Sequence, residues 1–420
     1  MTLLEIVYNH SRKEGFDLNS EYAKLGVDVQ KKGVESLTRI LDNEYPHAFC
    51  VVTTHNVFPN QGLVLHTDSV GTKPIQSYLN WKESDDLDSF KGLAQDVIAM
   101  NIDDIVCVGA SPISFVDYVA LNPFTIPKED FLKTLSQGFA ECLSILRMHG
   151  VDLQFAGGET AELADLIRLI DLSGTTLGIV ELDDIVSGET VSKDNVIIGL
   201  RSGGKTKLEK TVNSGIMCNG ITLARHALLR TDYSDKYPET RDLHTSPYTG
   251  HFHPNQYLDE LDMTVGEAIT SPTRLFAPII LKILEKHGSH VKGLLHNTGG
   301  GQTKCLRLGK NIHYIKTLME VDPIFPLIQE ASGEDWRTML ENYNMGTGFE
   351  IIVDAEVAED MLSIPERFGL EAKIIGRCEK SKDKNRLTIL SPWGKFHYPQ
   401  KPVRVPLEGS PLTITGDEPR

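Results

Sequence analysis

Residues 62–73 read GLVLHTDSVGTK, and this stretch decides how the chain is interpreted. Its apolar run predicts a β-strand that ends at Asp68, followed by a short glycine-containing loop and Lys73. A carboxylate in this position can hold a divalent cation, while backbone N–H groups and a lysine meet phosphate oxygens. The same residues also fit an ordinary strand and turn with a surface lysine, so the stretch alone leaves both interpretations open.

A second acidic pattern lies in residues 93–108, which are predicted to be helical. Asp96 and Asp103 are seven residues apart and share a helix face, whereas Asp104 is rotated by one residue. The apolar residues between them predict a mostly buried helix, and buried carboxylates require a partner. A cation is one such partner; an exposed acidic face is the alternative.

Two glycine-rich stretches add candidate ligand contacts. Gly157, Gly158 and Glu159 follow an apolar pair, so the backbone could approach a ligand while Glu159 adds an oxygen ligand. The alternative is a turn between a strand and a helix. Residues 298–301 (TGGG) predict a loop that contacts an anion through its backbone N–H groups.

The order of the predicted elements favours an α/β or α+β protein with more than one domain. Strand-like and helical patterns alternate in the first half, and a new strand begins at Asn195. We place the boundary within 183–194 and expect three parts: an N-terminal domain, a C-terminal α/β domain and a tail, at 1–188, 189–405 and 406–420.

Composition narrows the function classes. The chain has 420 residues, 40% of them hydrophobic, which is enough for two or three packed domains. A net charge of -16 argues against nucleic acid as a partner. The sequence shows no membrane-length apolar run and no signal-peptide pattern, so we expect a cytoplasmic protein without membrane partners. The six cysteines form no Cys-x-x-Cys pair and are interpreted as reduced structural thiols.

The second half contains a long polar segment, residues 231–262. Its periodicity fails, which predicts a solvated surface excursion. His244, His251 and His253 leave a metal site as the alternative. A helix is predicted next, over residues 271–287, opened by Pro272.

Residues 199–206 (GLRSGGKT) match the pattern of a phosphate-binding P-loop. Such a loop requires a helix that begins at Lys205 and Thr206. A helix here would end at Asn213 after about two turns, and no strand with a second metal-binding aspartate follows. We interpret the match as fortuitous; a P-loop NTPase and a non-catalytic binding protein remain the alternatives from other classes.

The motifs occur in the order seen in phosphoribosylformylglycinamidine cyclo-ligases, and the chain resembles that family. Several motifs are shared with hydrogenase-maturation dehydratases, selenophosphate synthetases and thiamine-monophosphate kinases, whereas YAKLGVD and NMGTG resemble the cyclo-ligases alone. The matching pieces are YAKLGVD (22–28), TDSVGTK (67–73), DVIAMNIDD (96–104), GASPISFVDY (109–118), GGETAE (157–162), NG (219–220), SPTR (271–274), TGGG (298–301) and NMGTG (344–348).

The resemblance implies an α+β, two-domain ATP-binding fold and a homodimer in which two N-terminal domains form a shared β-barrel. The resemblance also implies that the N-terminal domain binds ATP and metal and dimerises. It implies ATP-dependent ring closure of formylglycinamidine ribonucleotide to aminoimidazole ribonucleotide, with magnesium. Another ATP-dependent member of the superfamily, such as a maturation dehydratase or a small-molecule kinase, is the alternative. The residues implied near magnesium are Asp68, Asp104 and Glu159; near ATP, Lys24, Gly71, Thr72, Lys73, Asp96, Gly157 and Gly158; near substrate, Asn219, Arg274, Thr298, Gly299 and Gly300.

Lys73 is the expected catalytic residue, because its ammonium would balance charge on the transferred phosphoryl group. Several positions depart from the family pattern. The usual Gly-rich stretch before the first strand is replaced by residues 47–60, and Met217 with Cys218 replaces a usual His-Ser pair, so no general base is assigned. The other departures are Ser69, Asp103, Gln302 with Thr303, and an insertion between Gly204 and Ser214.

Overall fold

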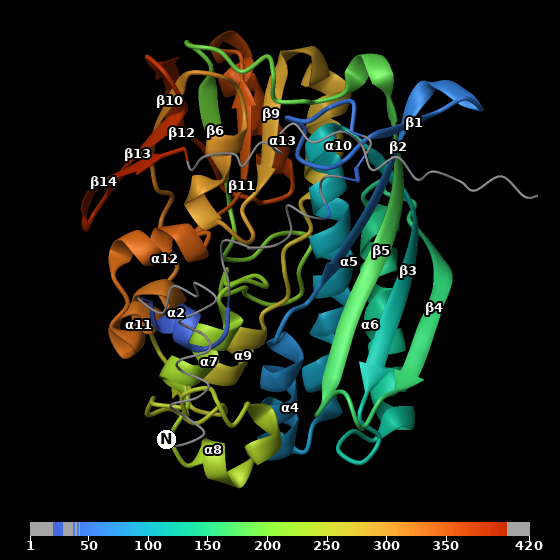
Figure 1. Cartoon of the computed structure of the whole chain (residues 1–420), viewed down its shortest axis with the longest axis vertical. Coiled ribbons are helices and arrows are strands. Elements are labelled where there is room, and N and C mark those ends of the chain that lie inside the picture. Colours follow the sequence, from blue (N-terminus) through green and yellow to red (C-terminus); the bar gives the residue numbers. More distant parts are fainter. Residues whose placement is uncertain (1–19, 28–36, 38–39, 42, 401–420) are drawn as a thin grey trace, which may run out of the picture.

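The computed structural model describes residues 20–27, 37, 40–41 and 43–400 (Figure 1). The tail expected at 406–420 lies outside these residues. Within them the chain forms two large sheets, one before residue 182 and one after residue 195. An α+β architecture with two successive sheet units is therefore confirmed.

The first sheet has the strand order β1-β2-β5-β3-β4 and is antiparallel except for the β3–β4 pair. Helix α5 packs on its central strands and α6 packs on α5, so both cover one face (Figure 1). The strand predicted to end at Asp68 and the helix predicted at 93–108 are both present, as β2 and α5. The elements are β1 (Thr53–His55), β2 (Phe58–Ser69), α4 (Lys73–Ser84), α5 (Gly92–Ile105), β3 (Ser111–Leu121), α6 (Lys128–Met148), β4 (Gln154–Glu162) and β5 (Ile170–Glu181).

The other face of this sheet is open in the single chain. Side chains alternate along β2, so Val64 is fully buried while Leu65 is 69% exposed. Val116 and Tyr118 of β3 are also exposed on this sheet. An apolar face of this kind usually marks an interaction surface.

The second sheet has the strand order β14-β13-β10-β12-β6-β11-β9, and only the β10–β13 pair is parallel. Helix α13 packs on β6 and β12, and α10 packs on α13. The elements are β6 (Val196–Arg201), α7 (Ile221–Leu228), α9 (Val265–Thr270), α10 (Ala277–His287), β9 (Val291–His296), β10 (Ile312–Thr317), α11 (Ile324–Ser332), α12 (Trp336–Asn342), β11 (Thr347–Val353), α13 (Ala358–Arg367), β12 (Ala372–Lys380), β13 (Arg386–Ser391) and β14 (Gly394–Pro399).

The helix predicted at 271–287 begins six residues later than expected, at Ala277. Residues 271–276 have no helical structure and run beside α5. The Asp103 carboxylate accepts hydrogen bonds from the backbone N–H groups of Phe276 and Ala277 at 3.1 and 2.7 Å. A carboxylate at these first amides marks the start of the helix, which local pattern could not reveal.

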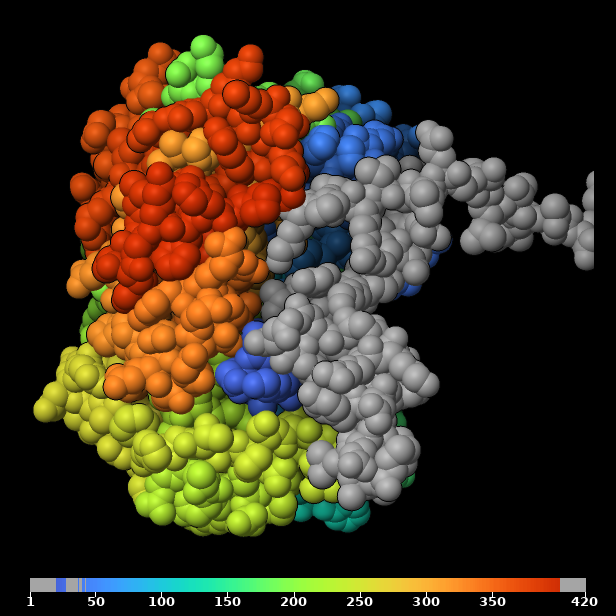
Figure 2. Space-filling model, turned by 60° about the vertical axis from the view of Figure 1, so that its left-hand side comes forward, coloured from blue at the N-terminus to red at the C-terminus, as the bar shows by residue number. Residues whose placement is uncertain are grey.

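The polar segment 231–262 is anchored rather than solvated throughout. It contains α8 (Tyr233–Lys236) and the short strand β7 (Tyr257–Leu258), which pairs with β8 (Met263–Thr264) directly after the segment. Tyr233 and Tyr248 are buried in it, and Glu83 at the end of α4 accepts hydrogen bonds from Lys236 and Tyr237. It forms the lower part of the molecule (Figure 2). In the described part of the chain, no group of three or more His, Cys, Asp or Glu residues is placed to hold a metal ion.

No helix follows the P-loop-like residues 199–206. Gly204 instead forms a β-bridge with Asn213, and Thr206 bonds to the Glu209 carboxylate at 2.8 Å. Lys205 is exposed. Without helix amides at Lys205 and Thr206 there is no phosphate cradle, so the interpretation of this match as fortuitous is confirmed.

Candidate active site

Motifs far apart in the sequence meet at the N-terminus of α7. Gly220 precedes this helix with φ of +75°, and a Cβ there would lie 2.0 Å from the Tyr343 ring. The Tyr343 hydroxyl donates to the Gly220 carbonyl at 2.8 Å, and the short helix that contains Tyr22 packs on α7. Residues 20–27 form the small blue patch beside the orange α11–α12 region in Figure 2. The segment that opens the cyclo-ligase-like pattern thus contacts the residues that begin α7.

The two stretches expected to contact substrate also lie together. A Cβ at Gly299 would be 3.3 Å from Asn219 Oδ1, so the TGGG loop faces Asn219 across van der Waals distance. The hydroxyl of Thr298 accepts a 2.5 Å hydrogen bond from Lys304. Gly300 has φ of +94°, a conformation that favours glycine.

The predicted phosphate loop reaches the same helix. Gly71 is exposed with φ of +57°, and the Thr72 hydroxyl lies 2.7 Å from the hydroxyl of Thr222 in the first turn of α7. The loop after β2 and the helix α7 therefore form one surface, although 150 residues separate the two threonines.

Lys73 is positioned differently from our expectation. Its side chain is fully buried, and its ammonium donates to Asp96 Oδ1 at 2.8 Å and to the Ser271 carbonyl at 2.6 Å. An ammonium enclosed by a carboxylate and a carbonyl cannot reach a phosphoryl group unless this ion pair opens. The structure assigns Lys73 to holding the loop, α5 and residue 271 together.

Asp96 and Asp103 share a face, as the helical spacing predicts, but their partners in the structure are protein groups: the Lys73 ammonium for Asp96, and backbone N–H groups for Asp103. Asp96 Oδ1 also accepts from the Thr273 backbone and hydroxyl, each at 2.7 Å. Asp103 binds the first amides of α10, and burial raises its pKa well above the usual value. The expectation that Asp96 contacts ATP is corrected, because Asp96 is fully buried among these donors.

Asp104 belongs to a buried polar cluster that also contains His66, His296 and Lys304. Asp104 Oδ1 accepts from His296 Nδ1 at 2.7 Å, and Oδ2 lies 3.5 Å from His66 Nε2. The pKa of His296 is lowered by burial, which keeps the imidazole neutral, while the pKa of Asp104 is lowered by His296 and Lys304 against the opposing effect of burial. Lys304 is 5% exposed, and burial lowers its pKa.

Glu159 cannot join Asp68 and Asp104 within one chain. Glu159 pairs with Tyr118, Tyr118 with Ser173, and Ser173 with Ser69, so Glu159 and Ser69 lie in one row on one face. Asp68 is the next residue and points to the opposite face, toward α5. Three strand spacings, about 14 Å, also separate the two strands. The expected three-carboxylate metal site is therefore wrong for the single chain.

The Gly157-Gly158 pair is neither a turn nor a phosphate loop. Both residues lie inside β4, at the exposed edge of the sheet. A Cβ at Gly158 would lie 1.6 Å from Asp117 Oδ1, so glycine is needed there for close strand packing. Contact with ATP in the same chain is not supported at these two residues.

Arg274 also differs from its expected role, whereas the expected place of Lys24 near ATP stays a prediction. Arg274 is 1% exposed, and its guanidinium is bound by Glu209 and by the carbonyls of Arg201, Gly203 and Gly204. It stabilises the 201–204 turn and has no donor left for substrate. Lys24 is exposed on the short helix α2 (Glu21–Lys24) and pairs with Glu21 at 2.6 Å.

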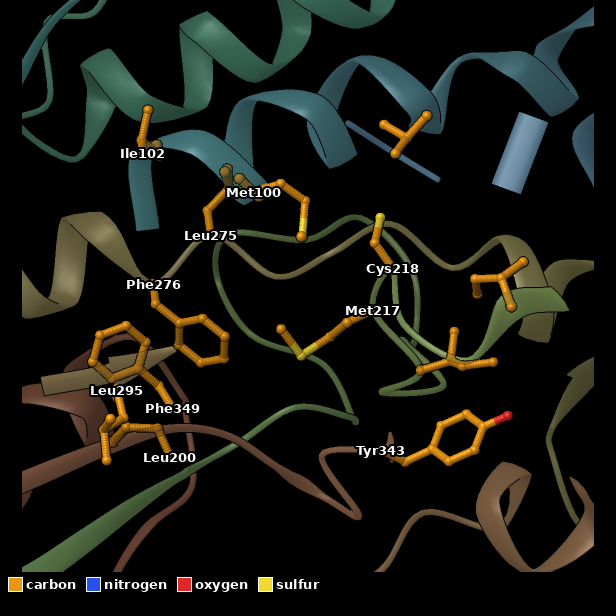
Figure 3. Close-up of a cluster of buried hydrophobic side chains, with 14 of the residues drawn as sticks. Met100, Ile102, Leu200, Met217, Cys218, Leu275, Phe276, Leu295, Tyr343 and Phe349 are labelled. Atoms are coloured by element: carbon orange, nitrogen blue, oxygen red, sulfur yellow. The ribbon is translucent and has the colours of Figure 1, made fainter. Parts of the chain in front are cut away.

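Met217 and Cys218, which replace a usual His-Ser pair, are buried beside α5. Their loop passes between α5 and Tyr343, with the Cys218 sulfur directed toward α5 (Figure 3). That sulfur lies 3.2 Å from Asp96 Oδ1, and burial raises the pKa of the thiol. A buried, protonated thiol is poorly nucleophilic, so Cys218 is a packing residue.

Sequence reasoning missed His66, His296 and Lys304. His66 lies two residues before Asp68 and His296 two residues before Thr298, so each borders a recognised motif. For the two histidines, proximity to those motifs was the signal in the sequence that could have identified them as site residues. Their association could not be read from the sequence, because His296 and Asp104 are 192 residues apart.

Within the described residues, every helix is too short or too polar to cross a lipid bilayer. Residues 49–180 match the N-terminal domain of AIR synthase related proteins, and residues 192–387 match the C-terminal domain. Among solved structures, the HypE–HypF complex matches with a TM-score of 0.53 at 17% identity, covering 87% of this chain and 97% of that chain. At this identity the likeness concerns the fold alone.

Two curated relatives are named phosphoribosylformylglycinamidine cyclo-ligase. The protein of Methanocaldococcus jannaschii is 34% identical over 333 residues, covering 78% of this chain and 81% of the relative. That of Pyrococcus horikoshii is 35% identical over 327 residues, covering 77% and 82%. With both domains matched and motifs from residues 22 to 343 meeting at α7, the chain belongs to the AIR synthase related family of ATP-dependent enzymes.

Proposed function

We propose that this chain closes the imidazole ring of formylglycinamidine ribonucleotide, using ATP and forming aminoimidazole ribonucleotide, ADP and phosphate. The observation that carries the proposal is that Thr72, Asn219, Gly299 and the short helix α2 with Tyr22 lie together at the start of α7. The relatives named cyclo-ligase match the chain over both domains. The substrate is a small molecule, and no nucleic acid or membrane is involved in the proposal.

The chemistry requires that a poor leaving group be activated. ATP phosphorylates the formyl oxygen, a neighbouring nitrogen attacks the same carbon, and phosphate departs. The chain's contribution is to position both substrates at the surface between Gly71 and α7 and to stabilise the developing charge. Lys73 supports this geometry through Asp96 and Ser271 and is not proposed to touch the reacting phosphoryl group.

Among the described groups in this region, the neutral imidazole of His296 is the best candidate for a general acid or base. Its Nδ1 donates to Asp104, and its Nε2 is buried with no hydrogen-bond partner. Asp104 thus fixes the tautomer and orientation of the ring. Because His296 is fully buried, we propose that the Asp104–His296 pair orients Lys304 and the TGGG loop (residues 298–301). Lys304 donates hydrogen bonds to the His296 carbonyl and to the Thr298 hydroxyl.

Magnesium is the expected companion of ATP, and the residues of one chain do not fit a closed site for it. Asp104 is engaged by His296, the Lys304 ammonium lies close by, and Glu159 is on the other face of the sheet. A homodimer joined through the open face of the first sheet remains part of the proposal, supported by exposed Leu65, Val116 and Tyr118.

The test is direct. Purified protein is incubated with formylglycinamidine ribonucleotide and ATP, with and without magnesium, and aminoimidazole ribonucleotide is measured. Product that requires ATP supports the proposal. Folded protein that forms no product under any metal condition contradicts it. Sedimentation velocity of wild type and Leu65→Glu tests the dimer, because a charge in the apolar face should shift the protein toward monomer.

A further inference from the structure

Among the residues that the structure describes, Arg225 of α7 is a buried cation without an anionic partner. It is 2% exposed, and its Nη1 donates to the carbonyl and hydroxyl oxygens of Thr72, both at 3.2 Å. Its Nε is buried and has no hydrogen-bond partner. In the described part of the chain, no carboxylate lies within ion-pair distance of it, whereas Arg274, equally buried, is held by Glu209. Burying an uncompensated charge is costly, so Arg225 requires an anion that the described residues do not supply.

A second unpartnered donor lies at the same end of α7. The Nδ2 of Asn219 is buried and has no hydrogen-bond partner. Asn219 comes directly before Gly220, the residue that caps the helix. The first amides of any helix also lack acceptors inside the helix, and the helix dipole makes this end positive.

These donors converge because of two contacts. The Thr72 hydroxyl touches both the Thr222 hydroxyl in the first turn of α7 and the Arg225 guanidinium. Thr72 therefore places the guanidinium beside the helix N-terminus. Gly71 is exposed next to it, so the loop is open to solvent at this point.

We infer that the N-terminus of α7, with Arg225 and Asn219, binds a phosphate group against the Gly71-Thr72 loop. A phosphate monoester or phosphate chain matches a guanidinium, an amide N–H and helix amides as donors. This inference deepens the proposed function and rests on it. The proposed function supplies two possible sources of the bound phosphate group: the phosphates of ATP and the 5′-phosphate of the ribonucleotide. The bound group joins the loop after β2 to α7, which come from the two halves of the chain.

The probe is inorganic phosphate, titrated by calorimetry into wild type and Arg225→Gln. We expect saturable binding by wild type and at least tenfold weaker binding by Arg225→Gln. The matched control is Arg230→Gln, which removes the same charge two residues beyond α7, where Arg230 is exposed and paired with Asp232. Its phosphate affinity should stay within twofold of wild type.

Because Arg225 is buried, its replacement could impair folding, so Asn219→Asp provides an independent test. This nearly isosteric change places a negative charge at the half-buried position and should weaken phosphate binding at least tenfold, with urea unfolding showing a folded protein. Absence of saturable phosphate binding in wild type overturns the inference. So does equal affinity in wild type and a folded Asn219→Asp or Arg225→Gln variant.

Two further titrations, with ATP alone and with the ribonucleotide alone, identify the source of the phosphate. The ligand whose affinity falls in Arg225→Gln is the one that places its phosphate here. The measurements do not depend on turnover. Phosphate binding that requires Arg225 in a protein without ring-closing activity would retain the site and reject the proposed function, and the reverse result would reject only the site.

Discussion

Asp104 Oδ1 accepts a 2.7 Å hydrogen bond from Nδ1 of His296, and this contact joins the helix on the first sheet to the end of β9 in the second. Both residues are buried, and the backbone carbonyl of His296 accepts from Lys304 at 2.6 Å. The contact links the two halves of the molecule beside the candidate active site. Its loss should therefore affect both stability and activity.

Asp104→Asn is expected to remain folded, because an amide oxygen can still accept from His296. The charge that stabilises buried Lys304 is lost, so we expect a cost of about 1–3 kcal/mol in the free energy of unfolding. The kcat/KM for ring closure should fall by roughly tenfold or more. Urea unfolding and steady-state kinetics measure both, with Asp152→Asn on the surface as control. Unchanged kinetics would remove Asp104 from the active-site framework.

Lys73→Met should destabilise the protein strongly, because it leaves the fully buried Asp96 without its cation. Breaking one side of a buried ion pair costs about 3–5 kcal/mol. The double variant Lys73→Met with Asp96→Asn should recover part of that loss, since the amide oxygen can still accept from Thr273. Urea unfolding of the single and double variants measures the coupling. A fully stable Lys73→Met protein would show that the ammonium serves ligand binding instead.

Lys205→Ala should leave ATP affinity and turnover within twofold of wild type. Lys205 is exposed, and no helix begins beside it to cradle phosphate. Calorimetric titration with ATP checks this. Thr72→Val is the comparison, because the Thr72 hydroxyl contacts Thr222 in the first turn of α7. If the Lys205 variant lost more affinity than the Thr72 variant, the P-loop-like residues would have a function after all.

Stability should fall as the pH is lowered from 6.5 toward 3 because of His226. Burial, assisted by neighbouring Arg225, lowers the pKa of this histidine to about 3. The unfolded chain binds the proton near pH 6.5 and the folded chain does not, so stability is present above pH 6.5 and is lost at about 1.4 kcal/mol per pH unit below it. His226→Gln should flatten this slope by one proton, whereas His244→Gln on the surface should not. Equal slopes for wild type and His226→Gln would contradict the assignment.

The sequence by itself predicted the fold class and several of its elements. The apolar run that ends at Asp68 predicted β2, and the helical pattern of residues 93–108 predicted α5 with Asp96 and Asp103 on one face. The false P-loop could also be recognised, because Asn213 and Gly215 oppose a helix there. These conclusions depend on residues within one or two turns of each other, where backbone preference and periodicity act directly.

Tertiary structure alone decided what each polar side chain contacts. Lys73 is bound by the carbonyl of Ser271, 198 residues away, and His296 reaches Asp104 from 192 residues away. Glu159 was placed with Asp68 from motif order, but strand register puts the two on opposite faces of the sheet. A buried charge takes whichever partner the packed sheets and helices bring to it, and no local pattern encodes that partner. Local motifs therefore identify the fold and family of the chain. Which residues meet in the candidate active site depends on contacts between segments that are distant in the sequence.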